Sequence, residues 1–169
     1  MPQPNESESV GIGHCVIRAS HPSDAPAMAR LDAQVSYSPF SLVQAERACD
    51  PADDFAFAYV LESDGVLTGF IVLGMGVKEA TVLALSVMPD RQGTGLGMQL
   101  LQHALTALAA LDVERCLLEV RATNAVAVAL YTKCGFTIDG QRAGYYKTPT
   151  VKEDAILMSR QIQGYMRRK

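Results

Sequence analysis

Closely spaced metal-ligating residues are missing from this sequence of 169 residues. It has three histidines and four scattered cysteines (Cys15, Cys49, Cys116 and Cys134), with no Cys-x-x-Cys pair and no cysteine–histidine cluster. Zinc sites use such clusters, so the sequence predicts no metal site, and free thiols of the cytosolic kind are expected. A Ser–His–Asp arrangement is not visible either, so nothing indicates a serine nucleophile.

Long apolar runs and a strong net charge are absent as well. No apolar stretch approaches the roughly 20 residues of a membrane-spanning helix, and residues 1–13 lack the basic and apolar regions of a signal peptide. The formal net charge is −3, from 15 basic and 18 acidic residues, which argues against nucleic acid as a partner. We expect a cytoplasmic protein with neither a membrane nor a nucleic-acid partner.

The composition is that of one globular domain. Hydrophobic residues make up 49% of the chain and charged residues 20%, and no repeat or linker is visible. Residues 1–13 carry no core-forming pattern and are expected to form a disordered tail. Residues 14–163 are expected to form the domain, and residues 164–169 a basic tail.

Apolar periodicity predicts a succession of helices and strands. Ser23 is expected to cap the first helix, and Ser63-Asp64-Gly65 to close a hairpin. The order after the hairpin is strand–helix–strand–helix–strand, which indicates a mixed α/β domain with a sheet as its spine. Strands are expected at residues 15–18, 55–61, 66–75, 81–87, 116–120, 136–138 and 155–158, and further helices at residues 41–48, 98–111 and 124–133.

The segment Gln92-Gly93-Thr94-Gly95-Leu96-Gly97 lies between an expected strand and an expected helix. Glycines leave the backbone N–H groups of such a loop open to one ligand, and the following helix adds the positive end of its dipole. These features favour a phosphate or pyrophosphate, although a glycine-rich turn without a ligand is the alternative. The loop lacks the terminal Gly-Lys-Ser/Thr of a P-loop, which argues against a nucleotide kinase or hydrolase.

Four segments, in this order, resemble the GNAT acetyltransferases: Leu85-Ser86-Val87, the Gln92 to Gly97 loop, residues 118–124 (Leu-Glu-Val-Arg-Ala-Thr-Asn) and residues 129–136 (Ala-Leu-Tyr-Thr-Lys-Cys-Gly-Phe). The loop fits the family pattern Gln/Arg-x-x-Gly-x-Gly/Ala. The third and fourth segments are similar to the RimI branch, which acetylates the N-terminal alanine of a small-subunit ribosomal protein. Ala84 departs from that branch, which often has asparagine there.

The resemblance implies a GNAT fold, with a mixed, mostly antiparallel central sheet flanked by helices. It also implies acetyl-coenzyme A as co-substrate, with the pyrophosphate on the backbone of the glycine loop. In the family the fourth strand splays from its neighbour, which frees backbone groups for the pantetheine. The cofactor-binding residues implied are Leu85, Ser86, Val87, Gln92, Gly93, Thr94, Gly95, Leu96, Gly97, Met98 and Asn124.

Two residues are candidates for proton transfer. Glu119 lies in an otherwise apolar strand; periodicity alone favours a solvent-facing side chain, whereas the resemblance implies the proton acceptor. Tyr131 follows Asn124 by two helical turns, so the two side chains are expected on one helix face. A core aromatic is the ordinary role of such a tyrosine, and the resemblance implies the proton donor to the leaving thiolate.

Four aromatic residues are candidates for an acceptor groove, although each could equally be a core or surface aromatic: Tyr37, Phe40, Tyr145 and Tyr146. The acceptor implied is the N-terminus of a small-subunit ribosomal protein, bound by a monomer or weak dimer. A GNAT enzyme for a small amine, such as a polyamine or antibiotic, is one alternative. A non-catalytic acyl-coenzyme A module is another, but it would not need Glu119 and Tyr131.

Overall fold

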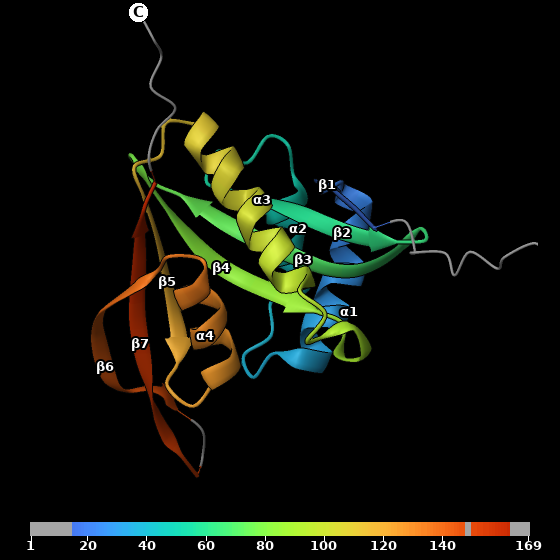
Figure 1. Ribbon diagram of the computed structural model, residues 1–169. Helices are drawn as coiled ribbons and strands as arrows, with labels where there is room; N and C mark the ends of the chain where they lie inside the picture. The colour runs from blue at the N-terminus through green and yellow to red at the C-terminus, as the bar shows by residue number, and fades with distance from the viewer. Residues whose placement is uncertain (1–14, 148–149, 163–169) are drawn as a thin grey trace, which may run out of the picture.

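The computed structural model describes residues 15–147 and 150–162, so the two expected tails lie outside the described residues. The described chain forms one seven-stranded sheet, in the order β1-β2-β3-β4-β5-β7-β6 (Figure 1). The strands are β1 (Cys15–Ala19), β2 (Ala56–Ser63), β3 (Val66–Met75), β4 (Glu79–Val87), β5 (Arg115–Arg121), β6 (Thr137–Lys147) and β7 (Lys152–Gln161). The helices are α1 (Ala25–Val35), α2 (Leu42–Cys49), α3 (Leu96–Ala110) and α4 (Ala125–Lys133), with 3-10 turns η1 (Pro22–Asp24) and η2 (Pro89–Arg91).

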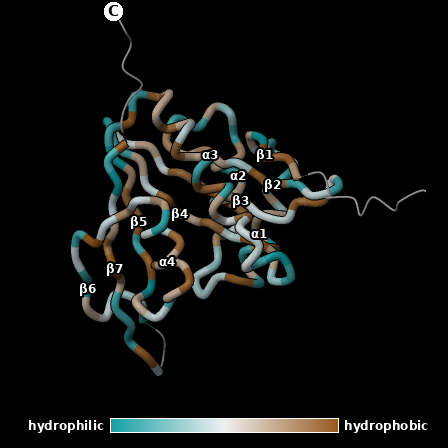
Figure 2. The backbone as a smooth tube through the Cα atoms, in the orientation of Figure 1, coloured by the Kyte–Doolittle hydropathy of each residue, from teal (hydrophilic) through white to brown (hydrophobic). Residues whose placement is uncertain are grey.

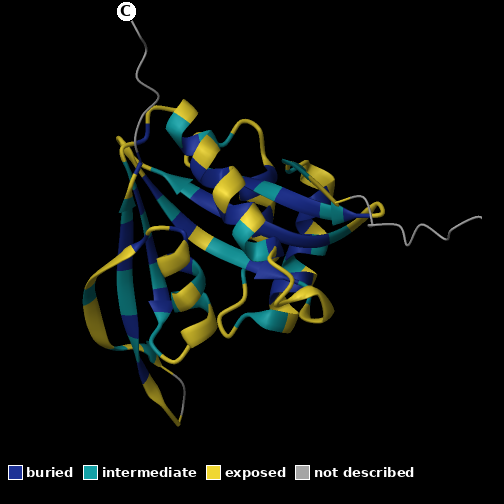
Figure 3. Cartoon of the chain, in the orientation of Figure 1, coloured by how far each residue is buried: buried dark blue, intermediate teal, exposed yellow. Residues whose placement is uncertain are grey.

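Helices cover both faces of the sheet, and each pair of helices closes a separate hydrophobic cluster. We call the cluster that contains Leu100, Leu101 and Tyr131, from α3 and α4, the α3-side core. The cluster that contains Met28 and Leu31 of α1 is the α1-side core. Successive residues of β3 alternate between the two, as strand geometry requires. The buried residues of α3 all belong to the α3-side core, and exposed residues lie between them along the helix (Figure 3).

The sheet is mixed and mostly antiparallel, as the sequence resemblance implies. Only β4 and β5 pair in parallel, and their register runs from Glu79–Arg115 to Val82–Leu118 and no further. A register shift against β3 leaves Leu83 as an extra residue immediately after Val82. A β-bulge of this kind bends its strand and increases the twist. The ends of β4 and β5 therefore diverge, which is visible in Figure 1.

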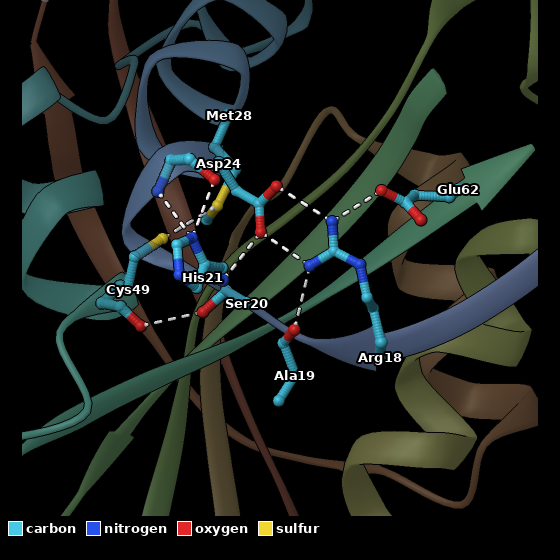
Figure 4. Close-up of polar contacts among 10 residues, drawn as sticks. Arg18, Ala19, Ser20, His21, Asp24, Met28, Cys49 and Glu62 are labelled. Carbon is cyan, nitrogen blue, oxygen red and sulfur yellow. Dashed lines mark hydrogen bonds and ion pairs between the residues drawn. The ribbon is translucent and has the colours of Figure 1, made fainter. Parts of the chain in front are cut away.

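The start of α1 differs from the sequence prediction, because Ser23 does not cap the helix. Ser23 lies inside η1, where its backbone N–H donates to Nδ1 of His21 at 3.2 Å. Asp24 occupies the N-cap of α1 without a side-chain cap bond, because its carboxylate binds Arg18 at 2.7 and 3.0 Å. Arg18 also binds Glu62 of β2, so this network fastens α1 to the sheet (Figure 4).

The other elements are confirmed in order and type, although several differ in length; β7, for example, spans Lys152–Gln161 where residues 155–158 were expected. Ser41 caps α2, and Asn124 caps α4 by accepting a hydrogen bond from the N–H of Ala127 at 3.1 Å. Helix α3 begins at Leu96, two residues before the expected start. Strand β6 extends to Lys147, whereas the sequence predicted an end at residue 138. The prediction was too short because this edge strand contains polar residues and glycines and lacks a clear apolar alternation. In the described part of the chain, no helix is long and apolar enough to cross a membrane.

Candidate functional site

The glycine loop between β4 and α3 is exposed and ends in an uncovered helix N-terminus (Figure 3). Gly93 and Gly95 have φ values of 74° and 87°, a left-handed conformation that glycine adopts without steric cost. Gly95 is the N-cap of α3, and the N–H of Gln99 donates back to its carbonyl at 3.1 Å. The N–H groups before that bond stand at the positive end of the helix dipole, which is the arrangement that binds anions.

Two side-chain contacts shape this loop from its own residues. Nε2 of Gln92 donates to the carbonyl of Val87 at 3.0 Å, which ties the loop to the end of β4. The Thr94 hydroxyl donates to the carbonyl of Arg91 at 2.6 Å. Residues 92–95 are exposed and hydrophilic (Figure 2), and within the loop only Leu96 is buried in a core. These two hydrogen bonds, rather than apolar packing, therefore fix the backbone of residues 92–95.

The first turn of α3 presents its backbone to the loop rather than its side chains. Leu96 is buried, Met98 is half-buried, and both pack in the α3-side core. A Cβ atom at Gly97 would lie 3.6 Å from the side chain of Leu130 in α4. These three positions can therefore contact an anion at the helix end through their backbone N–H groups.

The end of β4 leaves backbone groups at the edge where β5 has diverged. The N–H of Met88 donates to Thr68 of β3 at 2.8 Å. Backbone groups alternate in direction along a strand, so Ser86 also faces β3, while Leu85 and Val87 face the open edge. The Val87 carbonyl already accepts the Gln92 bond, which leaves its N–H and both groups of Leu85 for a ligand.

Ser86 bonds other residues of the protein and does not face the open edge of β4. Its side chain is buried and donates to Oδ1 of Asp32 in α1 at 2.5 Å. The other oxygen of Asp32 accepts the backbone N–H of Phe40 at 2.7 Å, and the Phe40 ring packs against the α1-side core. Asp32 therefore links the end of β4 to the loop after α1. Ala84, where the RimI branch often has asparagine, packs against the same core.

Glu119 projects from the middle of β5, beyond the last residue that pairs with β4. Its side chain is 30% exposed and forms an ion pair with Arg142 of β6 at 3.0 Å. The neighbouring residues Leu118 and Val120 are buried in the α3-side core, so Glu119 faces the opposite side of the sheet. Glu119 is therefore partly exposed, as periodicity alone favours, and its role as the proton acceptor stays a prediction.

Tyr131 lies on the α3 side of the sheet. It is 8% exposed, and its ring packs edge-on against Phe136 with centroids 5.8 Å apart. Burial raises the pKa of its hydroxyl to about 12, so the group stays protonated throughout the neutral range. Asn124 is exposed at the N-cap of the same helix. Glu119 and Tyr131 thus lie on opposite faces of the sheet.

Three of the four predicted acceptor aromatics gather near Glu119, on its side of the sheet. Tyr37, 53% exposed in the loop after α1, lies under the guanidinium of Arg121 at 3.7 Å from its ring centroid. Tyr146 of β6 lies 5.5 Å from the same guanidinium and packs edge-on against Tyr145. Burial first, and Glu119 second, raise the pKa of Tyr146. Phe40 instead packs against the α1-side core.

Sequence reasoning missed four residues of this site. Arg121 carried a signal, because it lies two residues after Glu119 and therefore on the same strand face. Arg142, Asp32 and Glu153 gave none, because their roles depend on contacts with distant segments. Among the described residues, no group of three or more His, Cys, Asp or Glu residues could hold a metal ion.

Comparison with known proteins gives the same family at the sequence and structure levels. The model of the acetyltransferase (GNAT) family matches residues 26–136, more than half of the chain. The ribosomal protein bS18-alanine N-acetyltransferase of Escherichia coli K12 is 40% identical over 101 residues, which are 60% of this chain and 68% of that protein. A Bacillus subtilis protein, named as a putative enzyme of the same kind, is 33% identical over 104 residues, 62% of this chain and 68% of its own.

The crystal structure of the ribosomal-protein-S18-alanine N-acetyltransferase from E. coli has a TM-score of 0.82 to this chain, at 30% identity. The match covers 92% of this chain and 99% of that one. Because the family model matches more than half of the chain, and the relatives and the crystal structure agree with it, this chain belongs to the GNAT family of acetyltransferases.

Proposed function

We propose that this chain transfers the acetyl group of acetyl-coenzyme A to the N-terminal α-amine of a protein that begins with alanine. Ribosomal protein S18 is the first acceptor to test, because the E. coli relative named for it matches 68% of its length at 40% identity. The proposal is supported by the position of Glu119 immediately beyond the last β4–β5 pair, on the face of the sheet opposite to Tyr131. An amine and a thioester can then meet where β4 and β5 diverge, with a proton acceptor on one side and a donor on the other.

The residues present fit acetyl-coenzyme A. Its pyrophosphate would lie on the backbone N–H groups from Gly93 to Met98, where the helix dipole favours negative charge. The N–H groups of Leu85 and Val87, and the carbonyl of Leu85, point to the open edge and can bond the pantetheine amides and the acetyl oxygen. When bound, the cofactor supplies the thioester that the amine attacks.

Glu119 is the proposed proton acceptor. A free α-ammonium group has a pKa of about 7.7–8.0, so a carboxylate can remove its proton near neutral pH, directly or through water. The ion pair with Arg142 holds the Glu119 carboxylate on the acceptor side of the sheet. Arg142 also carries positive charge beside the incoming amine, which favours the neutral amine over the ammonium.

Tyr131 is the proposed proton donor to the departing thiolate. With a pKa of about 12, its hydroxyl keeps a proton to donate at any physiological pH. An ordinary thiol has a pKa near 8.5, so coenzyme A is a good leaving group without strong acid assistance. Tyr131 therefore contributes to the rate of transfer without being indispensable.

The charges around Glu119 favour a protein N-terminus over a polyamine. Two guanidinium groups, Arg121 and Arg142, stand on this face, and each is paired with one carboxylate, Glu153 or Glu119. A polyamine needs several uncompensated carboxylates for its several charges, whereas a peptide brings one ammonium and polar backbone groups. The small-amine acetyltransferase is the second candidate, and the retained Glu119 and Tyr131 argue against a non-catalytic module.

The test is thiol release from acetyl-coenzyme A with a peptide that copies the mature N-terminus of ribosomal protein S18 and begins with alanine. The matched control is the same peptide with its α-amine blocked, and spermidine serves as the small-amine acceptor. Turnover on the free peptide alone supports the proposal. Turnover on spermidine alone contradicts it and favours the second candidate.

The domain limits, the monomeric or weakly dimeric state and the cytoplasmic location stay predictions of the sequence.

A further inference from the structure

The guanidinium of Arg121 lies between two aromatic rings that come from separate parts of the chain. The ring of Tyr37, in the loop between α1 and α2, has its centroid 3.7 Å from the guanidinium carbon. The ring of Tyr146, near the end of β6, has its centroid 5.5 Å away. Both distances lie within the range of cation–π attraction.

Glu153 of β7 fixes the orientation of this guanidinium. Two nitrogens of Arg121, Nε and one terminal nitrogen, donate to Oε2 of Glu153. The other carboxylate oxygen accepts the backbone N–H of Thr123 at 3.0 Å and also the Thr123 hydroxyl. Glu153 is 8% exposed, and the bonds from Thr123 and then Arg121 lower its pKa, so it remains ionised. The buried Glu153 carboxylate, with hydrogen bonds to both of its oxygens, therefore fixes the orientation of the Arg121 guanidinium plane.

The position of Arg121 relates it to the acceptor rather than to the cofactor. Its side chain and that of Glu119 lie on the same face of β5, two residues apart, which is about 7 Å along a strand. The glycine loop and the exposed edge of β4 belong to different elements. Tyr146, one of the two rings that Arg121 contacts, also lies close enough to Glu119 for that carboxylate to raise its pKa.

We infer that Arg121 is a positioning residue that aligns Tyr37 and Tyr146 as the two walls of the acceptor peptide site. This inference rests on the proposed function, because it assigns the rings to a peptide acceptor. Arginine suits the role because its planar guanidinium stacks on rings while two of its nitrogens donate to one carboxylate oxygen. Lysine keeps the charge beside Glu153 but has no plane to stack.

The experiment measures KM for the S18 peptide and KM for acetyl-coenzyme A in Arg121→Lys. We expect the peptide KM to rise about tenfold, the size of one lost cation–π contact, with the acetyl-coenzyme A KM unchanged. Tyr37→Leu should raise the peptide KM similarly, and Tyr37→Phe should not, because the ring rather than the hydroxyl makes the contact. Since the two groups act together, the double variant Arg121→Lys with Tyr37→Leu should be little worse than either single variant.

The matched control is Arg47→Lys, an exposed arginine of α2 that pairs with Asp53 and touches neither ring. Its KM values should match those of the wild type. An unchanged peptide KM in Arg121→Lys, or an equal rise in the KM for acetyl-coenzyme A, overturns the inference. Failure of the wild type to acetylate any free peptide instead refutes the proposed function, and the inference with it. Because Tyr37 is an exposed loop residue, its variants test the inference even if Arg121→Lys folds poorly.

Discussion

Replacement of Gly95 by alanine should weaken binding of acetyl-coenzyme A without a steric clash. Gly95 has a φ of 87° at the N-cap of α3, and a Cβ atom there would meet no heavy atom within 4 Å. The cost is therefore conformational, about 1–2 kcal/mol for a residue with a side chain in the left-handed region. If the loop relaxes to avoid this cost, the N–H groups leave their positions, and the KM for acetyl-coenzyme A should rise about 5- to 30-fold.

Gly65 supplies a matched control for this experiment. It lies in the turn between β2 and β3 with a φ of 78°, and a Cβ atom at this position would also have no heavy atom within 4 Å. Both Gly65→Ala and Gly95→Ala should lower the melting temperature by about 2–8 °C, given the usual 2–4 °C per kcal/mol for a domain of this size. Only Gly95→Ala should change the KM, measured by thiol release at saturating peptide. A lowered melting temperature with an unchanged KM in Gly95→Ala would refute the assignment of the loop, and a rise in both variants would show a general effect of destabilisation.

Three further predictions concern proton transfer and stability. Glu119→Gln should lower kcat/KM about 10²- to 10⁴-fold at pH 7, with a smaller deficit above pH 8 where the amine is already neutral; an unchanged pH–rate profile would place the base elsewhere. Tyr131→Phe should lower kcat about tenfold while the protein stays folded, because the ring still packs on Phe136; full activity would remove the hydroxyl from the mechanism. Arg18 lowers the pKa of Asp24, so the ionised carboxylate stabilises the fold above the unfolded pKa of about 3.9, and this stabilisation is lost as pH falls through the folded pKa. Asp24→Asn should therefore cost about 1–2 kcal/mol in urea unfolding at pH 7 and progressively less below pH 4, and a pH-independent difference would contradict the role of the ion pair.

Much of the fold could be predicted from local signals. Apolar periodicity located each strand and helix, and the helices expected from residues 41 and 124 begin at the residues that cap them, Ser41 and Asn124. The full length of β6 was not predicted, because this edge strand is held in the sheet by pairing with β7 alone and shows no apolar pattern. The cap at Ser23 was wrong because Arg18 draws Asp24 into an ion pair and the His21 ring takes the Ser23 N–H.

By itself, the sequence determined the glycine loop, the candidates Glu119 and Tyr131 and the order of elements around them. The loop and the order of elements depend on backbone preferences and spacings within a few residues, which a sequence displays directly, whereas the roles of Glu119 and Tyr131 were implied by the resemblance to the GNAT family. Only the tertiary structure decided that Glu119 and Tyr131 lie on opposite faces of the sheet, and that a bulge at Leu83 accompanies the end of pairing between β4 and β5. It also brought Asp32 to Ser86, 54 residues away, and Arg121 to Tyr37 and Glu153. Such contacts depend on how the whole chain packs, because the free energy that selects them is shared among segments that no local pattern connects.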